Sequence, residues 1–158
     1  MTAAIDTNIL FDILLPDQKH LESSLNLLKK TGRNHSLIIS EVVFGELASQ
    51  FDDRAVLTDL LQSTGINLIS SGPDALWEAS RAWRDYTDNR TPELRCAGCG
   101  SREIITCPKC LETITCRQHI ISDFLIGGHA FTLAGTLLTR DRGFYKRYFP
   151  HLQVLSSM

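Results

Sequence analysis

The chain of 158 residues alternates short apolar runs with longer segments in which apolar residues recur every three or four positions. Short apolar runs predict buried strands, and the longer spacing predicts amphipathic helices. The predicted strands are 2–5, 36–40, 66–70, 136–139 and 152–155. The predicted helices are 6–15, 17–32, 41–51, 54–63, 73–90, 118–135 and 141–150. Because strands that alternate with helices favour parallel pairing, we expect an α/β fold of three layers, with a central parallel sheet flanked by helices.

Two of the predicted helices carry packing signals. The expected buried face of the helix at 73–90 consists of four residues at helical spacing, Leu76, Ala79, Trp83 and Tyr86. The helix at 118–135 contains Gly127 and Gly128, each of which costs a helix about 1 kcal/mol relative to alanine. Their bare face predicts the close approach of a neighbouring helix or of a substrate backbone.

Four acidic residues lie where this fold predicts a site. In parallel α/β sheets the binding crevice lies beyond the carboxyl ends of the strands. Asp6 follows the first predicted strand directly, and Asp141 comes two residues after the fourth. Glu46 lies in the helix after the second strand, and Asp123 lies in an apolar helix that precedes the fourth strand. We therefore expect these carboxylates to gather at one edge of the sheet.

Each acid also has a simpler interpretation. Asp6 and Asp141 suit helix N-caps, and Glu46 and Asp123 suit solvated helix faces. Carboxylates between apolar neighbours are nevertheless costly to bury unless they are paired or bind a metal ion. Oxygen ligands in such a cluster fit Mg²⁺ or Mn²⁺, and these ions commonly serve phosphodiester hydrolysis. The cluster thus favours a metal-dependent hydrolase over a set of independent caps.

Four segments in this order, "IDTNILFD", "SEVVFGEL", "SDFLIGGHA" and "LLTRDRGFY", resemble the PIN-domain family of ribonucleases, and within it the VapC-like toxins of VapBC toxin–antitoxin pairs. The resemblance implies that Asp6, Glu46, Asp123 and Asp141 hold Mg²⁺ or Mn²⁺. It also implies that Asn8 and Thr139 orient Asp6 and Asp141, with Thr7 and Ser122 as weaker candidates. We further expect from it an endoribonuclease acting on RNA such as tRNA or rRNA, an antitoxin partner and a homodimer.

The helix at 141–150 adds basic residues beside Asp141. The predicted contacts with substrate phosphates are Arg140, Arg142, Lys146 and Arg147. Aromatic residues between them suit base stacking, although Phe144, Tyr148 and Phe149 equally suit the core. Residues 81–158 hold 11 Lys or Arg against 7 Asp or Glu, whereas residues 1–80 hold 5 against 11. This asymmetry fits a basic surface beside an acidic pocket, and it also fits scattered surface charge.

Residues 93–116 interrupt the α/β pattern and hold all five cysteines. Two C-x-x-C pairs, seven residues apart, predict a small inserted ribbon that binds one structural Zn²⁺ through Cys96, Cys99, Cys107 and Cys110. Cys116 and His119 offer a further possible ligand pair, which we expect to lie outside the zinc site. A site closed by four thiolates does not catalyse, so the ribbon is expected to contact RNA through Arg95, Arg102 and Lys109, to contact a partner protein, or to close a loop.

Several classes of protein lack support in the sequence. It contains no G-x-x-x-x-G-K-[ST] phosphate-binding loop and no G-x-S-x-G motif. Its N-terminus does not resemble a signal peptide and no apolar run is long enough for a membrane span, so we expect a cytoplasmic protein. We therefore predict a single nuclease domain over 1–158 with the ribbon inserted at 93–116. An RNA-maturation nuclease of the same family and a non-catalytic zinc-ribbon module that binds RNA or protein are the alternatives.

Overall fold

The computed structural model describes residues 1–15, 18–96, 98–114 and 119–156. Its centre is a five-stranded sheet in the order β3-β2-β1-β6-β7, in which every neighbouring pair is parallel. The strands are β1 (Thr2–Ile5), β2 (Ser36–Ile39), β3 (Ile66–Leu68), β6 (Thr136–Leu138) and β7 (Gln153–Leu155). β1, β2 and β6 are buried almost throughout, because helices cover both faces of the sheet.

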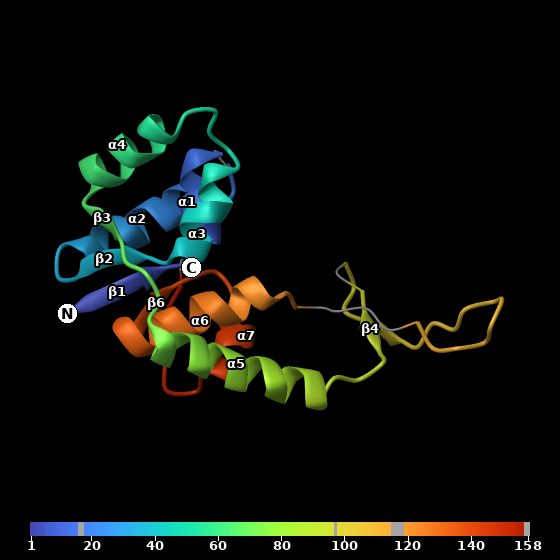
Figure 1. Ribbon diagram of the computed structural model, residues 1–158. Coiled ribbons are helices and arrows are strands. Elements are labelled where there is room, and N and C mark those ends of the chain that lie inside the picture. Colours follow the sequence, from blue (N-terminus) through green and yellow to red (C-terminus); the bar gives the residue numbers. More distant parts are fainter. Residues whose placement is uncertain (16–17, 97, 115–118, 157–158) are drawn as a thin grey trace.

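Seven helices make up the outer layers in the described part of the chain. They are α1 (Thr7–Leu14), α2 (Leu21–Gly32), α3 (Glu41–Ala48), α4 (Arg54–Thr64), α5 (Pro73–Asp88), α6 (Ile121–Leu133) and α7 (Arg142–Tyr148). The first four lie on one side of the sheet and the last three on the other (Figure 1). The predicted three-layer α/β fold is therefore confirmed. None of the described helices is long and apolar enough to cross a membrane.

The contact between α5 and α6 depends on the two adjacent glycines. A Cβ on Gly128 would lie 2.4 Å from the backbone oxygen of Ala75, and one on Gly127 would lie 2.2 Å from the Phe149 ring. The close approach that the glycines predict is thus made by a helix and an aromatic ring. The predicted face of α5 was shifted by one position at its start, because Ala75 is buried against Gly128 whereas Leu76 is 45% exposed.

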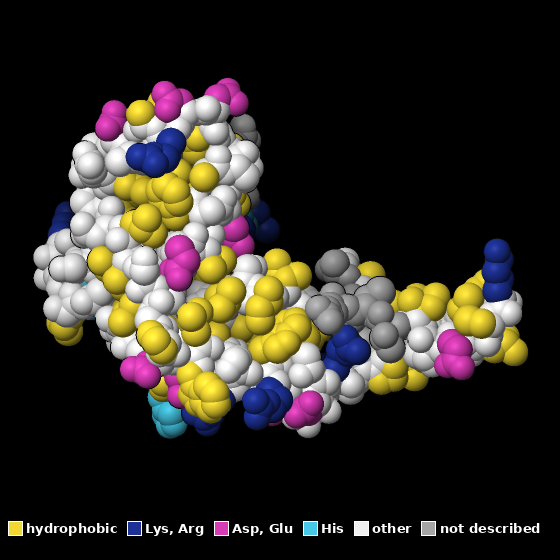
Figure 2. Space-filling model, viewed as in Figure 1, with side chains coloured by type: hydrophobic (Ala, Val, Ile, Leu, Met, Phe, Trp, Pro, Cys, Tyr) yellow, Lys and Arg dark blue, Asp and Glu magenta, His cyan; other side chains and the backbone are white. Residues whose placement is uncertain are grey.

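Between α5 and α6 the chain leaves the body and forms a projecting segment, here called the cysteine arm (residues 93–114). Figures 1 and 2 show it standing away from the three-layer body. It contains one antiparallel strand pair, β4 (Leu94–Arg95) with β5 (Arg102–Glu103), and an isolated bridge between Thr106 and Thr113. Most of its residues are exposed, so the arm adds no core of its own to the fold.

Candidate metal centre and nuclease site

The four predicted acidic residues line one pocket of about 270 Å³ at the carboxyl edge of the sheet. Asp6 directly follows β1, Glu46 lies in α3, Asp123 lies in the first turn of α6, and Asp141 precedes α7. As the side chains stand, no three His, Cys, Asp or Glu residues of the described ranges converge closely enough to hold one ion. The fold therefore gathers the carboxylates around a common space without joining them directly.

Asp6 is the buried member of this group, with only 7% of its surface exposed. Its Oδ2 accepts three hydrogen bonds, from Asn8 Nδ2 at 2.7 Å, Thr139 Oγ1 at 2.6 Å and Tyr145 Oη at 3.2 Å. No described residue donates to its Oδ1. Burial raises the pKa of Asp6 to about 6, although the Thr139 and Tyr145 hydrogen bonds lower it and the charges of Asp123 and Glu46 raise it further.

Asn8 and Thr139 connect the elements that carry the acids. Thr139 Oγ1 receives a hydrogen bond from the Asp141 backbone N–H at 3.0 Å, and Asn8 donates to the same oxygen at 3.1 Å. Asn8 Oδ1 in turn accepts from the Arg140 backbone N–H at 3.1 Å. The buried Thr139 side chain thus bridges Asp6 and the turn that begins at Asp141, and this network fixes the spacing of the two acids.

Asp141 also caps a helix, as its simpler interpretation expects. Its Oδ1 accepts from the Phe144 backbone N–H at 2.9 Å, the bond typical of an N-cap residue. Asp6 occupies the N-cap position of α1 but makes no such side-chain bond. Helix capping therefore explains the contact of Asp141 Oδ1. The orientation of Asp6 is set instead by its hydrogen bonds with Asn8, Thr139 and Tyr145.

Glu46 and Asp123 are half-buried and face the pocket from α3 and α6. The Thr7 hydroxyl donates a short hydrogen bond to Glu46 Oε2, and the Ile120 backbone N–H donates to Asp123 Oδ2 at 3.3 Å. Burial raises the pKa of Asp123, and the nearby Glu46 and Asp141 carboxylates contribute in the same direction. Ser122 Oγ is buried and has no hydrogen-bond partner among the described residues, so no contact links it to the acids.

The chemistry of this donor set fits a hard divalent cation. Four carboxylates supply only oxygen ligands, which Mg²⁺ and Mn²⁺ prefer. Asp6 is held by three donors on one oxygen and offers the other, while burial and neighbouring negative charge disfavour its ionised form when no cation is present. A cation in the pocket would offset both the cost of burying the Asp6 charge and its repulsion by the neighbouring carboxylates.

The predicted basic residues separate into different environments. Arg140 lines the acidic pocket, but its Nε lies 3.2 Å from Oδ2 of Asp12, which is only 2% exposed. Arg147 and Lys146 are exposed on α7, and Lys146 lines neither the acidic pocket nor the aromatic cavity described below. Arg142 begins α7, and its side chain lies outside the described part of the structure. The described side chains among the predicted phosphate contacts therefore lie in separate environments.

Replacing Arg140 is expected to lower stability as well as any RNA contact. Arg140→Ala leaves the buried Asp12 carboxylate with the Ser24 hydroxyl, at 2.6 Å, as its one remaining side-chain partner among the described residues. We expect a loss of about 1–2 kcal/mol, allowing for the partial exposure of the arginine. Chemical denaturation measures this loss. Adding Asp12→Asn in the same chain should recover most of it, because the unpaired charge is removed. A fully stable Arg140→Ala would contradict this structural role.

The cysteines lie in two turns of the same construction. In the first turn, the Cys96 N–H donates to Ser101 O and the Gly100 N–H donates to Cys96 O. In the second turn, the Cys107 N–H donates to Glu112 O and the Leu111 N–H donates to Cys107 O. Gly100 has φ +76° and Leu111 φ +63°, so the residue after the second cysteine is left-handed in both turns. The tight turn expected at Gly100 is thus present, and the leucine adopts the same conformation despite its side chain.

The expected convergence of four thiolates is not seen. The described residues contain no group of three metal-ligating side chains, and the cysteines stay in two separate pairs. Hydrogen bonding to Ser101 and to Cys96 lowers the pKa of Cys99 to about 7, and the backbone N–H groups of Cys110 and Lys109 lower that of Cys107. Each pair therefore holds one cysteine whose thiolate form is favoured, which suits the binding of a metal ion.

His119 and Cys116 follow the cysteine arm in the chain. The His119 ring packs among aromatic residues, 4.7 Å from Phe144 and 5.4 Å from Tyr86, and its place outside the zinc site stays a prediction. Cys116, the other half of that possible ligand pair, falls outside the described residues.

Tyr145, which contributes to the site, and Asp12, which pairs with Arg140 beside it, were not assigned these contacts from the sequence. Tyr145 is 1% exposed and donates to Asp6, but an aromatic residue in an amphipathic helix indicates only core packing. Asp12 interrupts the apolar positions of α1, and its burial beside Arg140 depends on a contact across 128 residues that no local pattern contains. An acidic residue inside an apolar run was the one available signal.

Comparison with known proteins agrees with this geometry. A family model described as the PIN domain matches residues 3–150. No curated protein matches the chain. Among solved structures, the chain is similar to VapBC2 from Rickettsia felis bound to a DNA fragment from its promoter, with a TM-score of 0.60 and 19% identity over 99% of this chain and 98% of that one.

Two further structures share the fold. VapBC-1 from nontypeable Haemophilus influenzae aligns with a TM-score of 0.61 and 15% identity over 99% of this chain and 98% of that one. FitAcB from Neisseria gonorrhoeae aligns with a TM-score of 0.56 and 14% identity over 98% of this chain and 96% of that one. At these identities the structures establish the fold, and the family model extends over nearly the whole sequence. The chain belongs to the PIN domain family.

Proposed function

We propose that the protein is a metal-dependent endoribonuclease and that the acidic pocket is its active site. The observation that carries the proposal is the state of Asp6, a buried carboxylate with one oxygen fixed by three donors and the other without a donor among the described residues, in a pocket that Glu46, Asp123 and Asp141 also line. A purely structural acid at this depth would be paired with a cation, as Asp12 is with Arg140.

In this proposal Asp6, Glu46, Asp123 and Asp141 hold Mg²⁺ or Mn²⁺. When bound, such an ion supplies an activated water and stabilises the charge that develops on the phosphate. Thr139, Asn8 and Tyr145 keep Asp6 Oδ2 fixed, so that the carboxylate does not rotate away from the pocket. Thr7 orients Glu46 in the same sense. The side chains are thus placed before substrate arrives, which is the arrangement that electrostatic catalysis requires.

We further propose that the protein is the toxin of a toxin–antitoxin pair, that it pairs with an antitoxin protein, and that it forms a homodimer. The solved structures that share its fold are VapBC and FitAcB complexes. The surface also supports protein contacts, because Figure 2 shows hydrophobic side chains gathered over α5. Trp77 on this helix is 64% exposed and Leu76 is 45% exposed, which is costly for a face that meets only water.

The test is cleavage of total cellular RNA by the purified protein with Mn²⁺ and with EDTA, beside Asp123→Asn purified in the same way. The proposal expects cleavage with Mn²⁺ that is absent in EDTA and in the variant. Cleavage by Asp123→Asn at the wild-type rate would show that the acidic pocket is not the active site. The same result would follow from a contaminating ribonuclease, which the EDTA lanes identify if it needs no metal.

We propose in addition that Cys96, Cys99, Cys107 and Cys110 bind one structural Zn²⁺. The support is the matched pair of turns, in which each second cysteine is followed by a left-handed residue and each first cysteine makes the same backbone bonds. Coordination by four thiolates requires the two turns to approach each other. The metal ion would then cross-link the cysteine arm, most of whose residues are exposed.

Zinc content is expected to depend on the paired cysteines alone. Protein purified without chelator should hold about one Zn²⁺ per chain by elemental analysis, and Cys110→Ser should lose most of it. Cys116→Ser is the control and should retain the metal. Absence of zinc from the wild type after reconstitution, or equal retention by Cys110→Ser, would contradict the proposed site.

A further inference from the structure

A second cavity, of about 430 Å³, lies beside the acidic pocket where the cysteine arm meets the body. Its volume falls within the roughly 300–1,000 Å³ typical of sites that enclose small molecules. Four parts of the chain line it: the end of α5 with the following loop, Glu93 and β5 of the arm, His119 two residues before α6, and α7 with the Asp141 that precedes it. Here it is called the aromatic cavity. The arm is thus one wall of a cavity whose other walls belong to the nuclease body.

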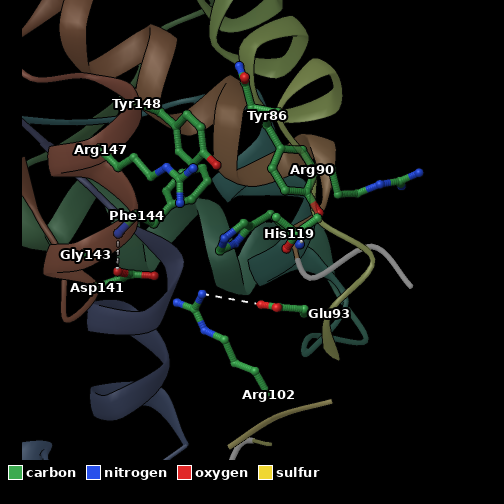
Figure 3. Close-up of a pocket in the computed structure, with 12 residues that line it drawn as sticks. Tyr86, Arg90, Glu93, Arg102, His119, Asp141, Gly143, Phe144, Arg147 and Tyr148 are labelled. Atoms are coloured by element: carbon green, nitrogen blue, oxygen red, sulfur yellow. Dashed lines mark hydrogen bonds and ion pairs between the residues drawn. The ribbon is translucent and has the colours of Figure 1, made fainter. Parts of the chain in front are cut away.

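The floor of this cavity is aromatic. The ring centroids of His119 and Phe144 lie 4.7 Å apart, and those of Phe144 and Tyr148 lie 5.1 Å apart. Tyr86 completes the group and lies 5.4 Å from His119. Figure 3 shows these rings grouped at the back of the cavity. Aromatic rings at the base of an open cavity suit the stacking of an unpaired nucleobase, which has a π-face whatever its sequence.

Cationic side chains stand around this floor. The Arg147 guanidinium lies 5.2 Å from the Tyr148 ring centroid, and no carboxylate of a described residue lies within ion-pair distance of it. Arg102 enters from the arm and faces Glu93 at 3.6 Å, which is longer than a hydrogen bond (Figure 3). Its side chain is 67% exposed, so this loose pair can be exchanged for a phosphate at little cost. Arg90 is directed away from the cavity centre (Figure 3).

The cavity adjoins the acidic pocket. Asp141 and Phe144 line both, so the two spaces share a wall formed by the start of α7. An RNA strand whose scissile phosphate lies at the four carboxylates would reach the aromatic cavity with its adjacent nucleotide. The acids repel phosphate when no metal ion is present, whereas Arg102 and Arg147 attract it.

We propose that the aromatic cavity binds the unpaired nucleotide adjacent to the cleaved bond, with its base on the half-buried His119 and Tyr148 rings, which the buried Phe144 ring supports, and its phosphate held by Arg102 and Arg147. This inference rests on the proposed ribonuclease function and specifies its substrate as single-stranded at that position. It also gives the cysteine arm a role, because Arg102 on β5 supplies one of the two cations.

The experiment measures binding apart from cleavage. A fluorescein-labelled single-stranded RNA of eight nucleotides is titrated by anisotropy into the Asp123→Asn protein, alone and combined with Arg102→Ala or Arg147→Ala. Arg81→Ala is the matched control, because Arg81 is similarly exposed at 63% and likewise faces one glutamate, but lies on α5 outside the cavity. The same titrations at several salt concentrations give the number of phosphate contacts.

Each of Arg102→Ala and Arg147→Ala is expected to weaken binding about five- to tenfold and to lower the salt slope by about one, whereas Arg81→Ala changes affinity less than about twofold. A duplex of the same sequence should bind the Arg102→Ala and Arg147→Ala variants as tightly as it binds the Asp123→Asn protein alone. Variants that bind the single strand as tightly as the control would overturn the inference, and the proposed nuclease would stand if cleavage still required Asp123. Failure of the Asp123→Asn protein to bind RNA at all would overturn both.

A protein partner in the cavity would give a different result. If Arg102→Ala and Arg147→Ala leave RNA affinity unchanged but convert a dimer to a monomer in size-exclusion chromatography with light scattering, the cavity belongs to an interface between copies of this chain. That outcome also overturns the inference.

Discussion

Asp6→Asn is expected to reduce the rate of RNA cleavage by about 10²–10³-fold, the usual cost of removing one charged or polar group that stabilises a transition state. The substitution keeps the shape of the side chain. Its amide oxygen can still accept the hydrogen bonds from Asn8, Thr139 and Tyr145, and the amide nitrogen replaces the open Oδ1. The loss should therefore report the missing negative charge at the metal-facing position. Single-turnover cleavage of one defined RNA in Mn²⁺ measures it.

The same substitution is expected to stabilise the protein when no metal is present. The folded-state pKa of Asp6, about 6, lies above its ordinary value of 3.8, so the folded state holds the proton more tightly than the unfolded state. The ionised form therefore destabilises the fold, by at most about 3 kcal/mol above pH 6. The advantage of Asp6→Asn over wild type should be near zero below about pH 3, grow between about pH 3 and 6, and then stay constant.

Asp59→Asn is the control for both measurements, because Asp59 is exposed on α4 and far from the pocket in the fold. It should change neither the cleavage rate nor the pH dependence of unfolding in EDTA. If Asp6→Asn cleaves RNA at the wild-type rate, or lowers metal-free stability at pH 7.5, then Asp6 is a structural residue and the assignment of the pocket is wrong.

Gly128→Ala is expected to destabilise the fold by about 3 kcal/mol, the upper end of the usual cost of overpacking a core. The added Cβ would lie 2.4 Å from Ala75 O and 2.9 Å from both the N and the Cβ of Ala79. Two of these three are backbone atoms of α5, so relief requires the whole helix to move away from α6. That cost exceeds the gain of about 1 kcal/mol in helix propensity. Chemical denaturation in EDTA gives the free energy of unfolding.

Gly45→Ala supplies the matched comparison. Gly45 also lies inside a helix, α3, but nothing stands within 4 Å of a Cβ placed there. The same change should therefore stabilise the protein by up to about 1 kcal/mol. Opposite signs at the two glycines are the expected result. If both substitutions stabilise the protein, α5 and α6 are not packed as closely as described.

The order and type of the elements follow from the sequence because buried parallel strands and amphipathic helices have different periods. The ends of the elements were predicted less accurately. The strand at 66–70 was predicted two residues too long, since its apolar Ile69 continues the run although its side chain is 41% exposed. The buried face of α5 was displaced because Gly128 draws in Ala75, and the size of a neighbour on another helix is not part of the local pattern.

The acidic group was accessible from sequence because the carboxyl ends of parallel strands share one edge of a sheet. Its supporting contacts were accessible only in part. Asn8 and Thr139 were named through the family resemblance, whereas Tyr145 was not, because its hydroxyl reaches Asp6 across 139 positions in the chain. Arg140 was taken for an RNA contact, and its pairing with Asp12 appears only once α1 and the start of α7 are brought together.

Paramagnetic resonance titration of Mn²⁺ tests most directly whether the four carboxylates form one metal centre. The signal of free Mn²⁺ is followed as wild type, Asp123→Asn or Asp59→Asn is added at pH 7.5. We expect saturable binding by wild type and Asp59→Asn, and at least about tenfold weaker binding by Asp123→Asn. Wild type that binds no Mn²⁺, or Asp123→Asn that binds it as tightly, would contradict the metal centre and with it the proposed nuclease.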